Sequence, residues 1–467
     1  MHKVRVCNAF FKQKPPPNPM KKRTFLRLSA AVATTPVLAP LARLIPYDDT
    51  LKNWAGNYTY STNRLHEAPS AEAAREWVRK QANFKVLGSR HCFNGIADST
   101  HQLLHLKGLD QLITLDAGAK TVTVGSAMKY GQLAPLLHAK GFALPNLASL
   151  PHISIGGAIA TGTHGSGVQN GNLATAVSAL EFITASGDVV RLSREKDGEA
   201  LRAAVVHLGA LGVVTQVRLD VEPTFQVCQN VYENLPLEEL EASFDRILEG
   251  GYSVSLFTNW QKKTFSEVWV KYRLTNNNRP APTEYFGAKA ATRNLHPIVE
   301  LSAENCTPQM GVPGPWFERL PHFKMGFTPS TGKELQSEYF VPYREGMEAL
   351  LAVEHLRDRI TPHLFISEIR TIAADNLWMS PHYRRPSLAI HFTWKQDWPA
   401  VRQLLPVIER ELAPFGARPH WGKLFATPPA QVAKLYDRLP DFQKLVREYD
   451  PKGKFANKFL RETILPA

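Results

Sequence analysis

Runs of apolar residues divide the chain into a mixed region and a later region that is richer in strands. Helical spacing predicts two helices in the first region, over 70–81 with Ser70 as its cap and over 131–140. Period-two or short apolar runs predict strands at 84–87, 101–106, 112–115, 120–125, 179–185, 189–192 and within 208–223. No GxGxxG follows any of these strands. The pattern therefore indicates an α+β fold and argues against a Rossmann dinucleotide site.

From about residue 226 the pattern changes to longer strands, framed by two helix-like stretches. Strands are predicted at 252–258, 265–272, 365–372 and 388–394, helices at 345–360 and 397–412, and a Pro/Gly-rich loop segment over 274–332. We read this as a second domain built on an antiparallel sheet. The expected organisation is an extension over 1–47, a first domain over 53–225, a second over 226–419 and a C-terminal segment over 420–467.

Charge is concentrated at the N-terminus. The chain has 55 basic and 42 acidic residues and a net charge of +13, but residues 1–47 hold nine of the basic residues and no acidic one. The remainder carries only +4, so the basicity belongs mostly to the tail. This distribution argues against a nucleic-acid-binding surface.

The same tail resembles an export signal. A basic cluster ending at Arg23 precedes an Ala-rich apolar run that is interrupted by Pro36 and Pro40 and is short for a stable membrane span. Lys22-Arg23 is similar to a twin-arginine signal, with Lys22 where the first arginine normally stands. We expect export to the periplasm. The alternative is a disordered basic extension on a cytoplasmic protein.

Glycine and small hydroxyl residues gather in three stretches of the first domain, Gly88-Ser89, Ser154–Gly157 and Thr161–Gly167. Such residues let a backbone approach a ligand closely and direct N–H groups at an anion. Together they suggest a bound dinucleotide. Metal ligation by His152 and His164 is a competing idea, but no acid or cysteine lies at a suitable spacing. We expect no metal.

Several motifs occur in a recognisable order. GSRHCFN, ALPNLASLPHISIGGAIATGTHGSG and LGALGVVTQV resemble the vanillyl-alcohol-oxidase class of flavoproteins, and within it the alditol oxidases. The similarity continues through YSVSLFT, GVPGPW, LQSEY, EIRTIAAD, HFTW and ARPHWGK, and covers the chain from Asn53 to its end. It implies a two-domain flavoprotein with FAD in the first domain, substrate in the second, and a C-terminal segment that completes the flavin site.

The resemblance implies that His91 is bonded through its ring to the C8 methyl group of FAD. Two departures flank it, since Gly is expected at Arg90 and Ser at Cys92. Arg90 would then place a bulky cation beside the flavin. The other residues implied in FAD binding are Val86, Leu87, Gly88, Ser89, Arg90, Cys92, Ser149, Ser154, Gly157, Thr161, Gly162, Thr163, His164, Val214 through its backbone, and His420.

Two predicted strands each present a polar pair. The strand period puts Glu368 and Arg370 on one face, and His391 and Thr393 on one face. From the residues alone, this face is either the solvent side of a sheet or the roof of a pocket. The resemblance implies a pocket in which a polyol is bound by Ser149, Glu368, Arg370, Thr393 and Lys423, with His391 beside them.

These residue types suit the oxidation of an alcohol. Glu368 can accept hydrogen bonds from hydroxyl groups and Arg370 can donate in a fixed fork. Arg370 and Lys423 can stabilise alkoxide charge. His391 is the candidate proton acceptor and Lys423 the rival base.

The implied function is FAD-dependent oxidation of the terminal hydroxyl of sugar alcohols such as xylitol or sorbitol to the aldehyde. A hydride goes to flavin N5, and O2 reoxidises the flavin to give H2O2, with Ala148 as the residue that controls access of oxygen. One alternative is an aldonolactone oxidase or dehydrogenase that uses another acceptor. An alternative of another class is a non-catalytic exported sugar-binding flavoprotein. We expect a monomer with no nucleic-acid partner and no stable membrane insertion.

Overall fold

A computed structural model describes residues 50–274, 282–326 and 333–465. Residues from Thr50 onward form one compact unit. The export segment predicted over 1–47 lies outside the described residues. None of the described helices combines the length and apolar character needed to cross a bilayer.

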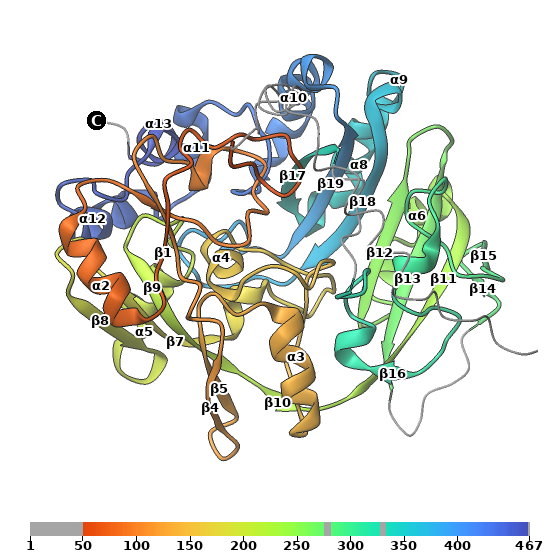
Figure 1. Cartoon of the computed structure of the whole chain (residues 1–467). Coiled ribbons are helices and arrows are strands. Elements are labelled where there is room, and N and C mark those ends of the chain that lie inside the picture. Colours follow the sequence, from red (N-terminus) through yellow and green to blue (C-terminus); the bar gives the residue numbers. More distant parts are fainter. Residues whose placement is uncertain (1–49, 275–281, 327–332, 466–467) are drawn as a thin grey trace, which may run out of the picture. The chain divides into compact units, whose positions relative to one another are not determined.

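The first layer is a five-stranded antiparallel sheet (Figure 1). Its order is β4 (Leu112–Asp116), β5 (Thr121–Gly125), β9 (Val213–Asp220), β7 (Val177–Ile183) and β8 (Val189–Ser193). Smaller sheets pair β1 (Leu65–Glu67), β3 (Leu103–His105) and β2 (Lys85–Val86) in parallel, and β10 (Glu222–Pro223) with β6 (Phe142–Ala143). The helices of this part are α2 (Ala71–Lys80), α3 (Tyr130–Ala139), α4 (Ile155–Ala160) and α5 (Arg194–Val205).

The second layer is a ten-stranded sheet. Its order is β14 (Glu284–Tyr285), β15 (Ala288–Ala290), β11 (Gln226–Pro236), β13 (Thr264–Arg273), β12 (Ser253–Thr258), β18 (Leu364–Ile372), β19 (Ser387–Lys395), β17 (Glu334–Pro342) and β20 (Arg418–Pro419), with β16 (Gly314–Pro315) paired to β11. All of its pairings are antiparallel. Its helices are α6 (Leu237–Ala242), α7 (Phe244–Leu248), α8 (Gly346–Glu354), α9 (Arg357–Ile360) and α10 (Trp398–Leu412).

The two faces of the central strands β17, β18 and β19 differ in character. One face carries apolar side chains such as Leu335, Ile369 and Trp394, which form a buried cluster with α8 and α10. Because side chains alternate along a strand, the opposite face carries Glu338, Arg370 and their neighbours. The polar face is buried as well, so it requires partners for its charges.

The end of the chain returns to the first layer. Figure 1 shows the blue helices α11 (Pro429–Leu435), α12 (Leu439–Tyr449) and α13 (Lys458–Thr463) beside the orange elements near residue 100. Leu439, Phe442 and Leu460 from these helices are buried in the core of the first layer. The predicted C-terminal segment is therefore packed against the domain from which it is farthest in sequence.

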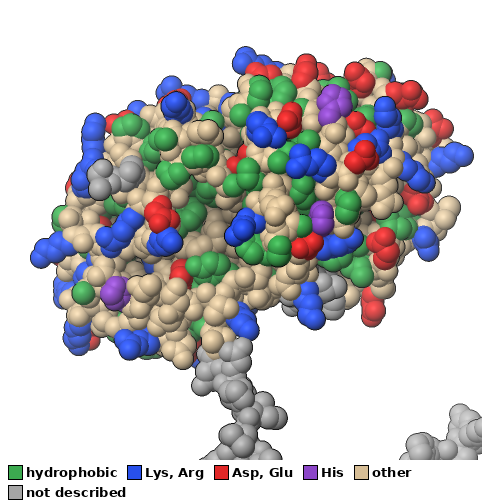
Figure 2. Space-filling view, turned by 90° about the horizontal axis from the view of Figure 1, so that it is seen from above, with side chains coloured by type: hydrophobic (Ala, Val, Ile, Leu, Met, Phe, Trp, Pro, Cys, Tyr) green, Lys and Arg blue, Asp and Glu red, His purple; other side chains and the backbone are tan. Residues whose placement is uncertain are grey.

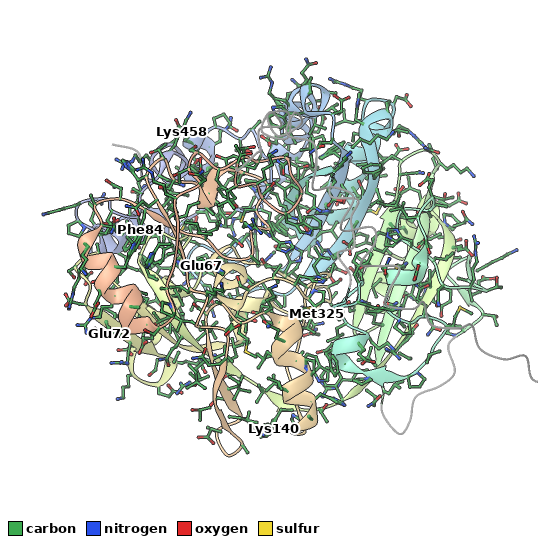
Figure 3. All side chains as sticks on the ribbon, in the orientation of Figure 1. Glu67, Glu72, Phe84, Lys140, Met325 and Lys458 are labelled. Carbon is green, nitrogen blue, oxygen red and sulfur yellow. The ribbon has the colours of Figure 1, made fainter. Side chains whose placement is uncertain are left out.

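Residues from the second half of the chain also reach α3. Met325 packs beside Gly131 at the start of α3, and its carbonyl oxygen lies 2.8 Å from Nε2 of His152. In Figure 3, Met325 lies near one end of α3 and Lys140 marks the other. This contact joins the segment after β16 to the glycine-rich stretch of the first layer.

The surface fits the expectation that the chain beyond the tail carries little net charge. Figure 2 shows Lys and Arg side chains interspersed with Asp and Glu on the face seen from above.

The structure confirms most predicted elements but corrects several. The helix over 70–81 is α2, and Ser70 caps it by accepting from the Ala73 N–H. The single helix predicted over 345–360 is wrong, because α8 ends at Glu354 and α9 begins at Arg357.

Several elements were not predicted, among them α5, β11 and β17. The helix α5 contains Gly198 in a non-helical conformation that interrupts its periodicity. The strands β11 and β17 were also missed. Every residue of β17 from Glu334 to Val341 is buried, so its apolar and polar residues do not alternate as they do in a half-exposed strand.

Asn94 connects the glycine-rich loop to the C-terminal segment. Its Nδ2 donates to the carbonyl oxygens of Trp421 at 2.9 Å and Lys423 at 2.7 Å. The substitution Asn94→Ala leaves both carbonyl groups without this donor, and should lower the free energy of unfolding by about 1–3 kcal/mol. Urea denaturation measures the change.

The matched control is Asn63→Ala, at an exposed position, which should stay within about 0.5 kcal/mol of the unmodified protein. Equal stability of the two variants would show that the Asn94 connection contributes nothing.

Candidate functional site

One cavity of about 500 Å³ lies between the glycine-rich loops and the polar face of the second sheet. The structure brings predicted residues of both kinds to its walls. From the cofactor set these are Val86, Leu87, Gly88, Ser89, Arg90, His91, Cys92, Ser149, Gly157, Thr161, Thr163, His164 and His420. From the substrate set these are Glu368, Arg370, His391, Thr393 and Lys423.

Close backbone packing forms a cradle at the glycine-rich end. A Cβ atom at Gly88 would lie 2.8 Å from Oγ of Ser154, so a side chain at this position would require the Ser154 hydroxyl to move. Ser89 Oγ accepts from the Ser154 N–H at 3.1 Å. Ser154 Oγ is buried and has no hydrogen-bond partner among the described residues. Gly88 and Gly157 both line the cavity, so backbone rather than side chain would face a bound ligand there.

Three predicted cofactor residues do not line the cavity within the described part of the chain. Ser154 lies behind Gly88 and Gly157. Gly162 has a φ of 67° and turns the chain after α4. The Val214 carbonyl accepts from Ser126 Oγ at 2.6 Å, so that oxygen is already engaged within the protein.

His91 is held at the wall of the cavity by Trp54. The two rings stack with centroids 5.1 Å apart and an interplanar angle of 26°. Burial, aided by the nearby Lys423 ammonium, lowers the pKa of His91 to about 3. The imidazole is therefore neutral at physiological pH, with a nitrogen lone pair available.

Arg90 adopts a left-handed backbone conformation, with a φ of 62°. Glycine tolerates this conformation without the steric cost that a side chain carries, which is a physical reason for the glycine expected there. The Arg90 carbonyl accepts from the Trp54 N–H at 2.9 Å. Its side chain is largely exposed, so it lies at the edge of the cavity and not within it.

Cys92 is a free cysteine next to His91. Burial raises the pKa of its thiol to about 11, which keeps it protonated and unreactive. The Cys92 carbonyl accepts from Nδ2 of Asn53 at 3.0 Å. At this position the backbone, and not the sulfur, supports the loop.

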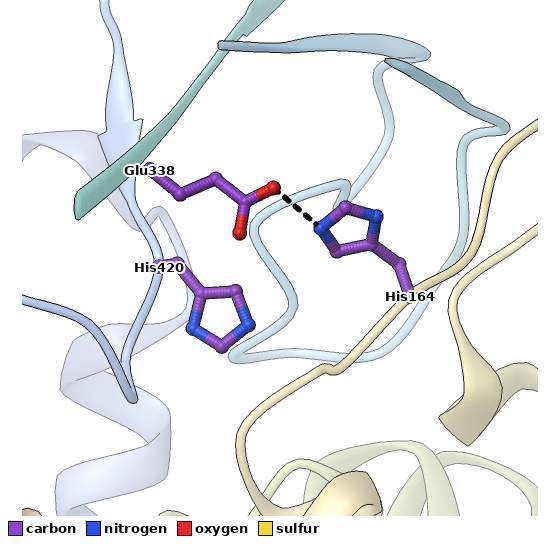
Figure 4. Close-up of side chains that lie close together, drawn as sticks. All are labelled: His164, Glu338 and His420. Atoms are coloured by element: carbon purple, nitrogen blue, oxygen red, sulfur yellow. Dashed lines mark hydrogen bonds and ion pairs between the residues drawn. The ribbon is translucent and has the colours of Figure 1, made fainter. Parts of the chain in front are cut away.

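Glu338, on β17, joins three of the predicted residues. Its Oε1 lies 2.7 Å from Nη2 of Arg370 and 3.0 Å from Nε2 of His164, and its Oε2 lies 3.3 Å from Nδ1 of His391. Figure 4 shows that Glu338 and His164, which make this contact, come from different segments of the chain. Burial raises the pKa of Glu338, but His164, Arg370 and His391 together hold it well below its usual range.

Sequence reasoning missed Glu338 and its neighbour Gln336 as site residues. Both lie in the LQSEY motif, which was noted only as a similarity, and on a strand that was not predicted. The pairing of β17 with β19 places Glu338 opposite His391 and Gln336 opposite Thr393. The signal available in the sequence was the motif itself, in which polar residues directly precede the apolar run Tyr339–Val341.

His164, Glu338 and His420 form a group whose ligand atoms lie within 4.8 Å of one another (Figure 4). The group has the composition of a metal site. However, the same Glu338 oxygen that faces His164 accepts from the Arg370 guanidinium at 2.7 Å. A permanent cation at that distance opposes a metal ion, so the arrangement favours an ion-pair network.

Glu368 and Arg370 lie side by side on β18 and are only 7% and 6% exposed. Arg370 Nη1 lies 3.4 Å from Ser149 Oγ, and Arg370 Nε lies 3.5 Å from Glu368 Oε1. Burial raises the pKa of Glu368, but Arg370 and His322 hold it well below its usual range. This face is turned into the cavity and not to solvent.

His391 and Lys423 approach the same space from two elements. His391 Nε2 lies 3.1 Å from Thr393 Oγ1. Lys423 donates to Gln336 Oε1 and lies 4.9 Å from the centroid of the Phe93 ring. Burial lowers the pKa of both His391 and Lys423, although Glu338 raises each of them in part. Both are therefore easier to deprotonate than in water.

Comparison with known proteins places this geometry in a family. Residues 66–193 match the family model described as FAD binding domain, and residues 327–463 match the model described as D-arabinono-1,4-lactone oxidase. The solved structure of cholesterol oxidase from B. sterolicum shares the fold, with a TM-score of 0.72 over 89% of this chain and 96% of that chain at 12% identity.

Two relatives differ in their sequence identity to this chain. L-gulonolactone oxidase from Scyliorhinus torazame is 27% identical over 441 residues, which cover 88% of this chain and 98% of the relative. Alditol oxidase from Streptomyces sp. is 47% identical over 416 residues, with the same two coverages. The chain belongs to the alditol oxidase family of FAD-dependent oxidoreductases.

Proposed function

We propose that the protein oxidises the terminal hydroxyl group of an open-chain sugar alcohol to the aldehyde. The observation that carries this proposal is the buried Glu368–Arg370 pair, which faces the same cavity as the glycine-rich cradle. An acceptor-only carboxylate beside a guanidinium matches a row of hydroxyl groups, each of which both donates and accepts.

FAD fits the cradle. Gly88, Ser89 and Gly157 line the cavity with little side chain in the way, which suits a pyrophosphate, and His91 and His164 line the same cavity. When bound, FAD supplies the acceptor for the hydride that leaves the alcohol carbon.

The protein's own residues orient the substrate and move its proton. Glu368 accepts a hydrogen bond from a substrate hydroxyl, while Arg370 is fixed by Ser149, Glu338 and Glu368 and cannot swing away. Such fixed positioning supplies a large part of the rate. Arg370 and Lys423 stabilise negative charge that develops on the alcohol oxygen.

We assign the proton acceptor as His391. Its Nδ1 faces the Glu338 carboxylate, which stabilises the imidazolium once the proton has been taken. Lys423 instead already donates a hydrogen bond to Gln336. It suits the role of a fixed positive charge better than that of a base.

His91 is proposed as the point of covalent attachment of FAD, because its neutral ring is held against Trp54 at the cavity wall. O2 is proposed as the final electron acceptor, with H2O2 as the product. Ala148 lines the cavity and is 8% exposed. Its small side chain leaves room for a small acceptor.

We also propose that the protein is exported from the cytoplasm. The order of a basic cluster and an Ala-rich apolar run in residues 21–45 supports it. Transport in the folded state would suit a protein that carries a bound cofactor.

Oxidation of an aldonolactone is the second candidate, since residues 327–463 match a lactone oxidase family model. At C1, a lactone has a ring carbonyl, which only accepts hydrogen bonds. An alditol has a hydroxyl group at that carbon, which can also donate. Peroxide production from xylitol, sorbitol and L-gulono-1,4-lactone distinguishes the two candidates. A preference for the lactone would overturn the alditol proposal.

The substitution His91→Ala should release FAD from denatured protein. Acid precipitation of the unmodified protein should leave yellow colour in the pellet, and tryptic peptide mass should place flavin on the peptide that contains His91. The His91→Ala pellet should be colourless, with FAD in the supernatant or absent. His101→Ala, at an exposed position nearby, is the control and should keep the colour. A yellow His91→Ala pellet would refute the attachment.

The rate of flavin reduction by xylitol should depend on pH through His391. Because burial lowers the pKa of His391 below its ordinary value of 6.5, the rate should rise with pH, with a midpoint below 6.5, and then remain constant. His391→Gln should reduce the rate about 100-fold or more and abolish this rise. Anaerobic stopped-flow absorbance measures both effects.

Lys423→Met tests the rival base. It should lower the rate but keep the rise with pH. If the rise disappears in Lys423→Met and persists in His391→Gln, the assignment of the base is reversed.

A further inference from the structure

A buried lysine and a buried histidine lie next to Glu368, and the histidine also lines the cavity. Lys271, on β13, is 1% exposed, and His322, in the segment before Met325, is 4% exposed. Lys271 Nζ lies 3.0 Å from His322 Nδ1, and His322 Nε2 lies 2.7 Å from Glu368 Oε1. The three side chains form a continuous chain of hydrogen bonds.

We propose that Lys271 and His322 are positioning residues that hold Glu368 as a charged acceptor for a substrate hydroxyl group. The inference rests on the proposed function, because it gives Glu368 a substrate contact. Neither Lys271 nor His322 was singled out in the sequence.

The surroundings of Lys271 fit an ammonium group. Its Nζ reaches three acceptors, which are the carbonyl oxygens of Leu320 and Pro321 and the ring nitrogen Nδ1 of His322. An ammonium has three N–H donors, so each donor has one acceptor. Burial lowers the pKa of Lys271 to about 7, while Glu368 raises it in part.

Lys271 selects the tautomer of His322. When an ammonium donates to Nδ1, that nitrogen must be the acceptor, and the ring proton of a neutral imidazole is then on Nε2. Burial and the Lys271 charge lower the pKa of His322 to about 4, which agrees with a neutral ring. Nε2–H then donates to Glu368.

The ring of His322 has little freedom to turn. It packs edge to face against Trp269, at a centroid distance of 5.0 Å, and against Phe257, at 5.7 Å. Its backbone N–H donates to the carbonyl of Ser149 at 3.1 Å. His322 is therefore tied both to the sheet and to the loop that carries Ser149.

The two carboxylate oxygens of Glu368 have different surroundings. Oε1 faces His322 Nε2 and Arg370 Nε. Among the described residues, none is hydrogen-bonded to Oε2, which leaves it for the substrate. A charged carboxylate can only accept, so the site selects a ligand that donates, namely a hydroxyl, over one that presents a carbonyl.

Three variants separate positioning from a purely structural role. His322→Phe keeps a ring but removes both hydrogen bonds. His322→Gln retains a carbonyl that can accept from Lys271 and an amide that can donate to Glu368. Lys271→Met keeps the aliphatic length and removes the charge. Lys289→Met, at an exposed position on β15 of the same sheet, is the matched control.

Anaerobic stopped-flow reduction by xylitol gives an apparent Kd and a limiting rate for each folded variant. We expect His322→Phe and Lys271→Met to raise the apparent Kd about tenfold or more, as expected for loss of a hydrogen bond to a charged group, with a smaller change in the limiting rate. His322→Gln should recover most of the affinity, and Lys289→Met should match the unmodified protein. An unchanged Kd in His322→Phe and Lys271→Met would overturn the proposal.

The tautomer is tested without substrate, in the flavin-loaded protein. Nitrogen-15 NMR of histidine-labelled protein, with the His322 signals assigned by their loss in His322→Gln, should show a protonated Nε2 and an unprotonated Nδ1. Lys271→Met should change this pattern, and Lys289→Met should not. A proton on Nδ1 of His322 in the unmodified protein would refute the inference. Failure of the unmodified protein to oxidise any alditol would instead refute the proposed function and leave the NMR result standing.

Discussion

The site depends on one buried negative charge, the carboxylate of Glu338. An anion that is 2% exposed is stable only when cations and hydrogen-bond donors surround it closely. Those partners are His164 from the glycine-rich stretch, Arg370 from β18 and His391 from β19. Because Glu338 contacts all three, it fixes the position of the glycine-rich stretch relative to the second sheet.

The rest of the network follows from the same constraint. Arg370 balances Glu338 on one side and Glu368 on the other. His322 donates to Glu368 through Nε2, and its Nδ1 accepts a hydrogen bond from Lys271. Positive and negative groups therefore alternate across the sheet, separated by histidines whose pKa values are lowered by burial. A polar face of this size can be buried because each charge has a close partner of opposite sign or a hydrogen-bond donor.

The backbone supports this network from both ends of the chain. Asn94, three residues after His91, donates to the carbonyl of Lys423. The Phe93 N–H donates to the carbonyl of Gly422 at 2.8 Å. The loop proposed to carry FAD and the loop that carries Lys423 are thus one hydrogen-bonded unit, although more than 300 residues separate them.

The sequence by itself indicated many of the local elements and two groups of candidate site residues. Glycine spacing indicated the cradle, and the strand period put Glu368 with Arg370 and His391 with Thr393. It could not show that β17 lies between β19 and β20, because a strand buried on both faces has no alternation to read. Only the tertiary structure decided that Glu338 joins the two groups and that Lys271 orients His322. Those contacts cross between strands and loops far apart in the chain, and pairing of that kind is set by packing and charge balance, not by local pattern.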